Sequence, residues 1–214
     1  MSTNIGYWEQ ILQAPTPAYA ELFKAESEYL QKNIKSEDSV LDVGCGEGRN
    51  VKTIFAIAKN VTGVDNDEIA VKDALNNFIE NPTVKIVKGE AVALPFADNS
   101  FDVVTFLMIL PNLDAFKIKA FSEVARVLKS GGVMLLSTFA ETAFDERIAI
   151  YKQVGSPIVR IEGTKVIFDK SLGANISEQF SLEEIKAMAS ATGFVFVDAK
   201  KVGTLAYLCK FLKP

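Results

Sequence analysis

The chain contains no histidine and only two cysteines, Cys45 and Cys209. Zinc sites are usually built from Cys and His ligands, and two thiols without histidine do not make one, so we expect no metal site. The absence of histidine also removes the side chain that most often acts as a general base near neutral pH. Zinc chemistry and imidazole general-base catalysis are therefore excluded.

Long apolar runs and clusters of positive charge are also missing. No run reaches the ~18 apolar residues that a membrane span needs, and residues 1–10 lack the basic-then-apolar pattern of a signal peptide. The net charge is −4, and Lys200–Lys201 is the only adjacent basic pair. The basic stripe that a phosphate backbone requires is absent. We therefore expect a cytoplasmic protein without a nucleic-acid or membrane partner.

The length of 214 residues predicts one domain over 1–214. Between 38 and 139, apolar runs alternate with helical patterns, as is typical of a parallel sheet wrapped by helices. The last two strands, joined around Gly203, are expected to be antiparallel neighbours. The expected strands are 40–43, 61–64, 84–87, 101–107, 133–139, 194–200 and 205–211, and the expected helices include one that starts at Thr16-Pro17, one over about 113–128 and one opened by the Ser181–Glu184 capping box.

The segment with the clearest chemistry is Asp42-Val43-Gly44-Cys45-Gly46-Glu47-Gly48, which follows an apolar strand and precedes a helical pattern. Glycine lets the backbone turn sharply and lets a ligand approach without a Cβ in the way. The next helix presents free N–H groups to an anionic or polar ligand. Because ligands of doubly wound sheets bind beyond the carboxyl ends of the strands, this loop is predicted to form the ligand site.

Two further segments follow the second and third strands. Asp65 stands roughly 20 positions past the loop, where a carboxylate is suited to accept hydrogen bonds from both hydroxyls of a ribose. The alternative is that Asp65 only caps a helix, but the loop upstream favours the ribose role. Gly89-Glu90-Ala91, followed by Leu94-Pro95-Phe96, is expected beside the same cleft, where it is suited to frame a flat heterocycle.

Taken in order, these segments resemble the class I S-adenosylmethionine (SAM)-dependent methyltransferases, in the small-molecule branch with an Asp-x-Gly-x-Gly-x-Gly loop. The resemblance runs from about Val40 to Phe139, and several motifs in order are more specific than any one of them. It includes residues 40–49, Val64-Asp65, Gly89-Glu90-Ala91 with Leu94-Pro95-Phe96, residues 100–104, and residues 123–129 with Gly131-Gly132. The implied fold is a Rossmann-like, doubly wound α/β domain with a seven-stranded, mostly parallel sheet of order 3-2-1-4-5-7-6, its last strand antiparallel.

The resemblance also implies the roles of single residues in binding SAM. The residues assigned to the cofactor are Asp42, Gly44, Cys45, Gly46 and Gly48 (methionine end), Asp65 (ribose hydroxyls), Asn66, Glu90 and Ala91 (adenine), and Phe106 and Leu107 (floor beneath the sulfonium). The product would be S-adenosylhomocysteine. The implied strand order separates Cys45 from Cys209 by three strands, about 14 Å at ~4.8 Å per strand, so both should stay free thiols.

The chain departs from the family pattern after the fourth strand, where relatives often carry histidine and this sequence has Pro111 and Asn112. Methyl transfer is a direct in-line displacement at a carbon activated by the positive sulfur, so the protein mainly positions the reactants. A base is needed only for a protonated nucleophile, and the sequence singles out no catalytic residue among its Asp, Glu, Tyr and Lys side chains. The expected acceptor is a small molecule.

Two segments are expected to cover the cleft and to carry acceptor specificity. They are the N-terminal helix region 1–36 and an insertion over 140–180, with a hairpin formed by 158–161 and 165–168. The candidate substrate or lid residues are Tyr7, Trp8, Tyr19 and Pro111. Aromatic side chains there are suited to pack against the methyl-bearing cation, and packing within the core or lid is the alternative for each.

Three other kinds of protein share part of the pattern of a methyltransferase. A nicotinamide-dependent oxidoreductase needs Gly-x-Gly-x-x-Gly, whose third glycine would fall at Arg49. A P-loop is excluded because no Gly-Lys-Ser/Thr follows the loop. A non-catalytic SAM-binding regulatory or scaffold protein would carry the same cofactor motifs, and it remains the alternative to an enzyme.

Overall fold

The computed structural model describes residues 7–169 and 176–214, which form two sheets and the helices around them. The main sheet consists of β1 (Ser39–Val43), β2 (Asn60–Asp65), β3 (Lys85–Lys88), β4 (Phe101–Leu107), β5 (Leu128–Phe139), β9 (Val195–Val202) and β10 (Ala206–Leu212). A smaller sheet consists of β6 (Ile158–Glu162), β7 (Lys165–Phe168) and β8 (Ile176–Ser177). The helices are α1 (Tyr7–Gln13), α2 (Pro17–Asn33), α3 (Arg49–Phe55), α4 (Glu68–Asn77), α5 (Lys117–Val127), α6 (Phe144–Gln153) and α7 (Leu182–Ala191), with short 3-10 turns η1 (Leu110–Asn112) and η2 (Asp114–Phe116).

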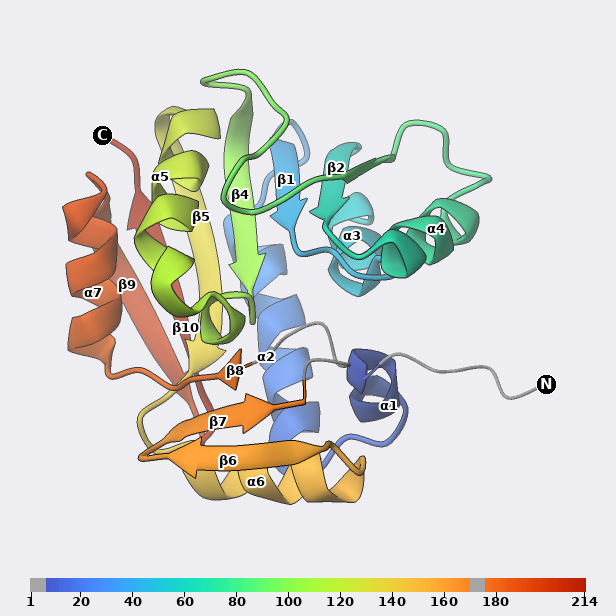
Figure 1. The fold of residues 1–214 in the computed structure, drawn as a ribbon. Helices are drawn as coiled ribbons and strands as arrows, with labels where there is room; N and C mark the ends of the chain where they lie inside the picture. Colours follow the sequence, from blue (N-terminus) through green and yellow to red (C-terminus); the bar gives the residue numbers. More distant parts are fainter. Residues whose placement is uncertain (1–6, 170–175) are drawn as a thin grey trace.

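The main sheet has the strand order β3-β2-β1-β4-β5-β10-β9 (Figure 1). β1 to β5 are parallel to one another, whereas β10 runs antiparallel to both of its neighbours, β5 and β9. The expected doubly wound fold and its strand order are therefore confirmed, with β10 as the last strand of the chain. Such a sheet brings the carboxyl ends of β1, β2 and β4 to one edge.

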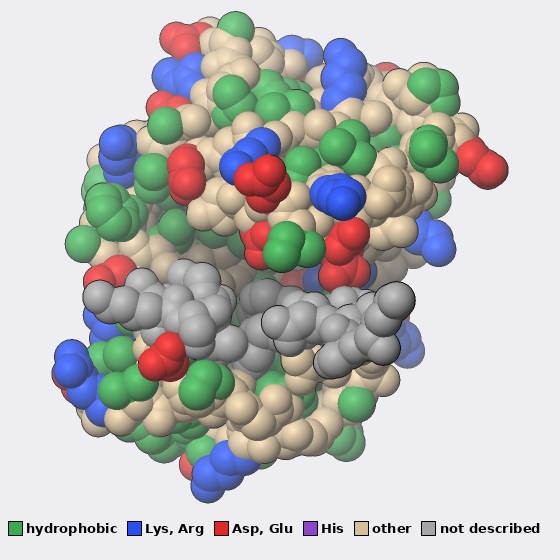
Figure 2. All heavy atoms as spheres, turned by 45° about the vertical axis from the view of Figure 1, so that its right-hand side comes forward, with side chains coloured by type: hydrophobic (Ala, Val, Ile, Leu, Met, Phe, Trp, Pro, Cys, Tyr) green, Lys and Arg blue, Asp and Glu red, His purple; other side chains and the backbone are tan. Residues whose placement is uncertain are grey.

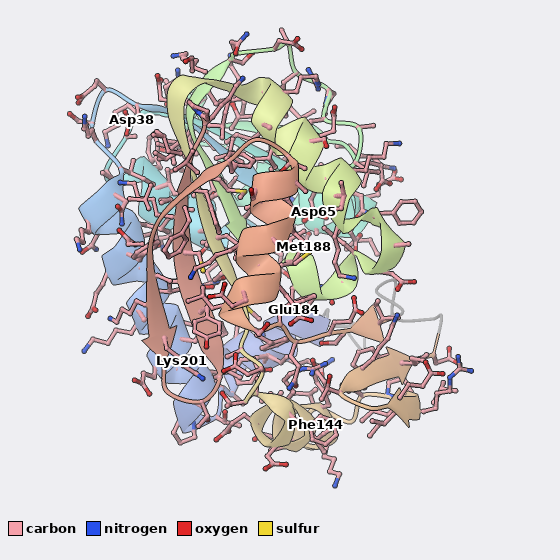
Figure 3. The ribbon with its side chains drawn as sticks, turned by 90° about the vertical axis from the view of Figure 1, so that its left-hand side faces the viewer. Asp38, Asp65, Phe144, Glu184, Met188 and Lys201 are labelled. Atoms are coloured by element: carbon pink, nitrogen blue, oxygen red, sulfur yellow. The ribbon has the colours of Figure 1, made fainter. Side chains whose placement is uncertain are left out.

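Helices cover both faces of the sheet because its strands are apolar on both sides. α2 and α3 pack on one face and α5 and α7 on the other (Figure 1). Two predicted helix starts are confirmed. The Thr16 side chain accepts a hydrogen bond from the first turn of α2, and Ser181 and Glu184 form a capping box at the start of α7. Glu184, labelled in Figure 3, lies at the lower end of α7 in that view.

The predicted helix over 113–128 is wrong at its start. Two 3-10 turns precede α5, and Asp114 adopts a φ of 46°, which a right-handed helix cannot contain. β5 also begins earlier than expected, because Leu128 already pairs with Phe101 before the register shifts. α1 and β8 were not expected from the sequence at all. The hairpin predicted after residue 157 is confirmed as β6 and β7.

The small sheet lies with α1 and α6 beyond the carboxyl ends of the parallel strands (Figure 1), and we name α1, α6 and β6–β8 the cap. Backbone hydrogen bonds join the segment after β8 to η1 and to the end of β5 in the main sheet. The Glu178 N–H donates to the Pro111 carbonyl at 3.0 Å, and the Phe180 N–H donates to the Phe139 carbonyl at 3.0 Å. Figure 3 shows α6, which begins at the labelled Phe144, well below the labelled Asp65. None of the helices within 7–169 and 176–214 combines the length and apolar character needed to cross a membrane.

Candidate functional site

The glycine loop turns sharply between β1 and α3, and its three glycines all have positive φ values: 69° at Gly44, 53° at Gly46 and 96° at Gly48. They differ in what surrounds them. A Cβ on Gly44 would lie 1.9 Å from Ile109 Cδ1, and a Cβ on Gly48 would lie 2.4 Å from Phe78 Cε2. These two glycines are therefore required by side chains of the protein itself.

Gly46 is the open position of the loop. A Cβ there would meet no atom of the described residues within 4 Å, so these residues leave the space above this glycine open to a ligand. Its N–H donates to Asp65 Oδ2 at 2.8 Å, which holds the loop against the end of β2. The sequence analysis assigned the same role to all three glycines, whereas the structure shows that Gly46 is the one of the three beside open space.

The residues predicted around the ribose and adenine come together at the ends of β2 and β3. Asp65 accepts N–H groups from Gly46 and, at 2.9 Å, from Asp67. The Asn66 side-chain amide donates to Glu90 Oε2 at 3.2 Å. Each carboxylate oxygen has two lone pairs, so Asp65 retains acceptor capacity for the hydroxyls of a ligand. The N-cap of α4 is Asp67, whose side chain accepts from the first turn of the helix, and this leaves Asp65 free of the capping role.

Asp42 is buried near the start of the loop, with 1% of its surface exposed. Its Oδ1 accepts a hydrogen bond of 2.5 Å from the Thr105 hydroxyl, whereas its buried Oδ2 has no hydrogen-bond partner among the described residues. Burial raises the pKa of Asp42 to about 7, against the opposing effects of the Thr105 hydrogen bond and the Arg49 charge. A buried carboxylate oxygen without a donor is suited to receive the ammonium of an amino-acid group.

Cys45 contributes its backbone to the loop, since its thiol is directed into the protein. The side chain is buried, and a Cβ on Gly63 would lie 2.8 Å from its Sγ. Burial raises the pKa of this thiol well above its ordinary value, so it stays protonated and unreactive. Cys45 and Cys209 are both free, as expected from the strand order.

Phe106 and Leu107, predicted to form the floor beneath the sulfonium, point to opposite faces of β4. Phe106 has no exposed surface and packs on Phe121 with ring centroids 5.9 Å apart. Leu107 lies in the core on the α2 face with 5% exposed. The role of Phe106 and Leu107 beneath the sulfonium stays a prediction. Just after β4 ends, the side chain of Ile109 covers Gly44. The sequence carried no local signal for this contact.

The residues predicted to meet the acceptor are placed in different settings. Tyr7 and Trp8 lie in α1, and their side chains are outside the described part of the structure. Tyr19 is fully buried and packs edge-on against Phe139, with ring centroids 6.2 Å apart. Pro111 is buried in η1 and binds the cap through its carbonyl. Tyr19 and Pro111 are therefore both buried, and their role toward an acceptor stays a prediction.

Charged side chains also join the cap to the segment after β4. Lys165 of β7 contacts Asp114 at 2.6 Å, and Lys117 pairs with Glu178. Figure 2 shows acidic side chains gathered on the main body above the cap. In the described ranges 7–169 and 176–214, no group of three or more His, Cys, Asp or Glu residues is placed to hold a metal ion.

Comparisons with known proteins agree with the fold described above. The methyltransferase domain model matches residues 41–136, from β1 to β5. A demethylmenaquinone methyltransferase of Staphylococcus aureus is 32% identical over 184 residues, covering 77% of this chain and 70% of its own length. A Pyrococcus horikoshii protein superposes with a TM-score of 0.72 at 22% identity, covering 94% of this chain and 93% of its own. A SAM-dependent methyltransferase of Methanosarcina mazei superposes with a TM-score of 0.67 at 22% identity, covering 86% and 96%.

The chain belongs to the class I SAM-dependent methyltransferases. It is an enzyme, and its methyl donor is SAM. The alternative of an oxidoreductase is excluded by the same findings.

Proposed function

We propose that this protein transfers the methyl group of SAM to a small-molecule acceptor, with the cofactor held along the carboxyl ends of β1, β2 and β3. Two observations at the same loop carry the proposal: among the described residues, the buried oxygen Asp42 Oδ2 has no hydrogen-bond partner, and the space above Gly46 is open. An amino-acid tail supplies the missing ammonium, and a glycine without neighbours leaves room for it. SAM supplies an electrophilic methyl carbon, and the side chains described here bind and orient it.

The roles assigned to single residues follow from this placement. The charge on Asp42 faces the methionine ammonium, and the backbone from Gly44 to Gly48 lies along the methionine end. Asp65 accepts the ribose hydroxyls, while Asn66, Glu90 and Ala91 surround the adenine. Leu107 and Ile109 lie where β4 reaches the reacting centre. Phe106 supports β4 from within the core.

The acceptor is proposed to be a small molecule rather than a nucleic acid. The net charge is −4, which disfavours a phosphate backbone. The Staphylococcus relative is named for demethylmenaquinone, a small molecule. We propose that regions 1–36 and 140–180, together with the catalytic core in a single domain, enclose this acceptor, because the cap lies beyond the strand ends. We also propose that the protein belongs to the small-molecule branch of the family, the branch with the Asp-x-Gly-x-Gly-x-Gly loop.

Replacing Asp65 with alanine is expected to weaken SAM binding roughly 10- to 100-fold, because the ribose loses its acceptor and the Gly46 N–H loses its partner. Isothermal calorimetry with SAM and S-adenosylhomocysteine measures this, with NAD and NADP as ligands expected to give no heat. Glu68→Gln is the matched control, since the Glu68 side chain is 83% exposed and only pairs with Lys88. Equal affinities for wild type and Asp65→Ala would contradict the ribose role.

Transfer itself is measured with SAM labelled on the methyl group. Demethylmenaquinone and a panel of small phenols, thiols and amines serve as acceptors, alongside RNA and DNA. Label in a small-molecule product supports the proposal. Label in nucleic acid alone, or SAM binding without transfer to any member of the panel, counts against a small-molecule acceptor.

A further inference from the structure

Glu26 of α2 is a carboxylate buried inside the protein, with 1% of its surface exposed. Both of its oxygens have partners. Oε2 accepts from the Arg49 guanidinium at 2.7 Å, and Oε1 accepts from the Ser137 hydroxyl at 2.6 Å. Burying a carboxylate is costly unless it is paired, and exchanging a buried ion pair for apolar side chains is often neutral for stability. Packing alone therefore does not account for a charge at this position.

The partner of Glu26 on one side is the residue that ends the glycine loop. Arg49 is the first residue of α3, directly after Gly48. Its guanidinium also lies over the ring of Phe23, 4.6 Å from the centroid. Phe23 and Glu26 are one turn apart on α2, so this helix holds Arg49 by a stacked ring and by an ion pair at once. The position of the loop is thereby linked to α2.

The partner on the other side leads to the end of β4. Ser137 of β5 accepts the Met108 N–H through its hydroxyl at 3.0 Å, while the same hydroxyl donates to Glu26. Met108 is one of three non-glycine residues with positive φ in the described ranges, at 58°. This turn directs the next residue, Ile109, onto Gly44. A chain of three hydrogen bonds thus runs from the β4 exit through Ser137 and Glu26 to Arg49.

Glu26 and Arg49 also set the charge around Asp42. The groups that act on this buried carboxylate are the Thr105 hydroxyl of β4, Arg49 of α3, Glu26 of α2 and Asp65 of β2. Arg49 lowers the pKa of Asp42, whereas Glu26 and Asp65 raise it. The two members of the pair therefore act on Asp42 in opposite directions, which gives each a distinct signature in a pH titration.

We propose that Glu26 is a positioning residue of the cofactor site: from α2 it holds Arg49 at the end of the glycine loop and, through Ser137, the backbone turn at Met108. This inference rests on the proposed function, because it assumes that the loop and Asp42 receive the methionine end of SAM. Glu26 acts through the other residues of this chain and needs no contact with the ligand. α2 is then part of the site as well as a cover of the sheet.

The test measures SAM affinity by calorimetry between pH 5.5 and 7.5, and each variant is compared with wild type at the same pH because the α-amino group of SAM, with a pKa of about 7.7–8.0, begins to lose its proton in the upper part of this range. In wild type, affinity rises with pH as Asp42 ionises. Glu26→Gln is expected to move this rise to lower pH by about one unit and to weaken the limiting affinity roughly tenfold. Arg49→Gln is expected to move the rise to higher pH. Glu26→Asp keeps the charge, so the rise stays near its wild-type position although the limiting affinity falls.

Glu28→Gln is the matched control, because Glu28 lies on the same helix with a side chain that is 55% exposed. It is expected to titrate like wild type. Thermal unfolding of each variant establishes that it is folded, and if Glu26→Gln is not, Arg49→Gln and Glu26→Asp still carry the test. Shifts in the same direction for Glu26→Gln and Arg49→Gln, or no shift in either, would overturn the inference. Wild type that fails to bind SAM would instead overturn the proposed function.

Discussion

An Arg147→Ala variant is expected to lose about 3–5 kcal/mol of unfolding free energy, because one fully buried guanidinium holds the cap together. Arg147 of α6 has no exposed surface. It donates to the Thr164 carbonyl at 2.9 Å, to Gln179 Oε1 at 2.7 Å, and to the Ser177 carbonyl and hydroxyl at 2.5 and 2.9 Å. It also lies 5.1 Å from the ring centroid of Phe139 at the end of β5. Alanine would remove all four hydrogen bonds and leave the carbonyl of the buried Ser177 without the Arg147 donor.

Urea unfolding at one pH measures the loss, and Arg160→Ala is the matched control within the same cap. The Arg160 side chain is 63% exposed and pairs only with Glu162 on the surface, so its removal should cost less than about 0.5 kcal/mol. Arg147→Lys should recover little, since an ammonium cannot span acceptors in both the β6–β7 turn and β8. Arg147→Ala and Arg160→Ala with the same unfolding midpoint would show that the cap does not depend on Arg147.

An Asp42→Asn variant is expected to be more stable than wild type at pH 8 and about 100-fold weaker in SAM binding. Burial raises the pKa of Asp42 to about 7. Between about pH 4 and 7, the folded protein therefore keeps a proton that the unfolded chain has released, so stability falls as pH rises through this window and stays low above it. At pH 8 wild type buries a charge, and asparagine removes that cost, which for a pKa shift from about 4 to about 7 is about 4 kcal/mol.

The negative charge of Asp42 is also what the ammonium of SAM requires. Removing this charge is therefore expected to lower the affinity for SAM while it raises the free energy of unfolding. Urea unfolding at pH 5 and pH 8, with calorimetry at pH 7.5, measures both effects. Asp38→Asn is the control: Asp38 accepts the Lys35 N–H at 2.7 Å just before β1, at the opposite end of that strand from the loop. A stability gain at pH 8 without a loss of SAM affinity would show that Asp42 does not face the cofactor.

Much of the candidate cofactor site consists of short stretches of sequence that were predicted to come together, and their roles toward SAM stay predictions. The run from Asp42 to Gly48, the acid at Asp65 and the segment at Glu90 each follow a strand directly, and parallel strands bring their carboxyl ends to one edge. The helix starts at Thr16 and Ser181 could also be predicted from the sequence, because a helix cap depends on residues within one turn. In these cases a local pattern determines a local backbone.

The sequence by itself thus determined the class of fold, the strand that ends in the glycine loop and the cofactor. Only the tertiary structure decided that Gly46 is the loop glycine beside open space, because side chains from distant elements contact the others: Ile109 lies against Gly44 and Phe78 against Gly48. It also decided that Glu26 is buried, although a glutamate in an amphipathic helix ordinarily faces water. Its partner Ser137 lies 111 residues away. Contacts between residues so far apart in the sequence depend on how the helices pack on the sheet. The local spacing of residues along the chain therefore does not predict them.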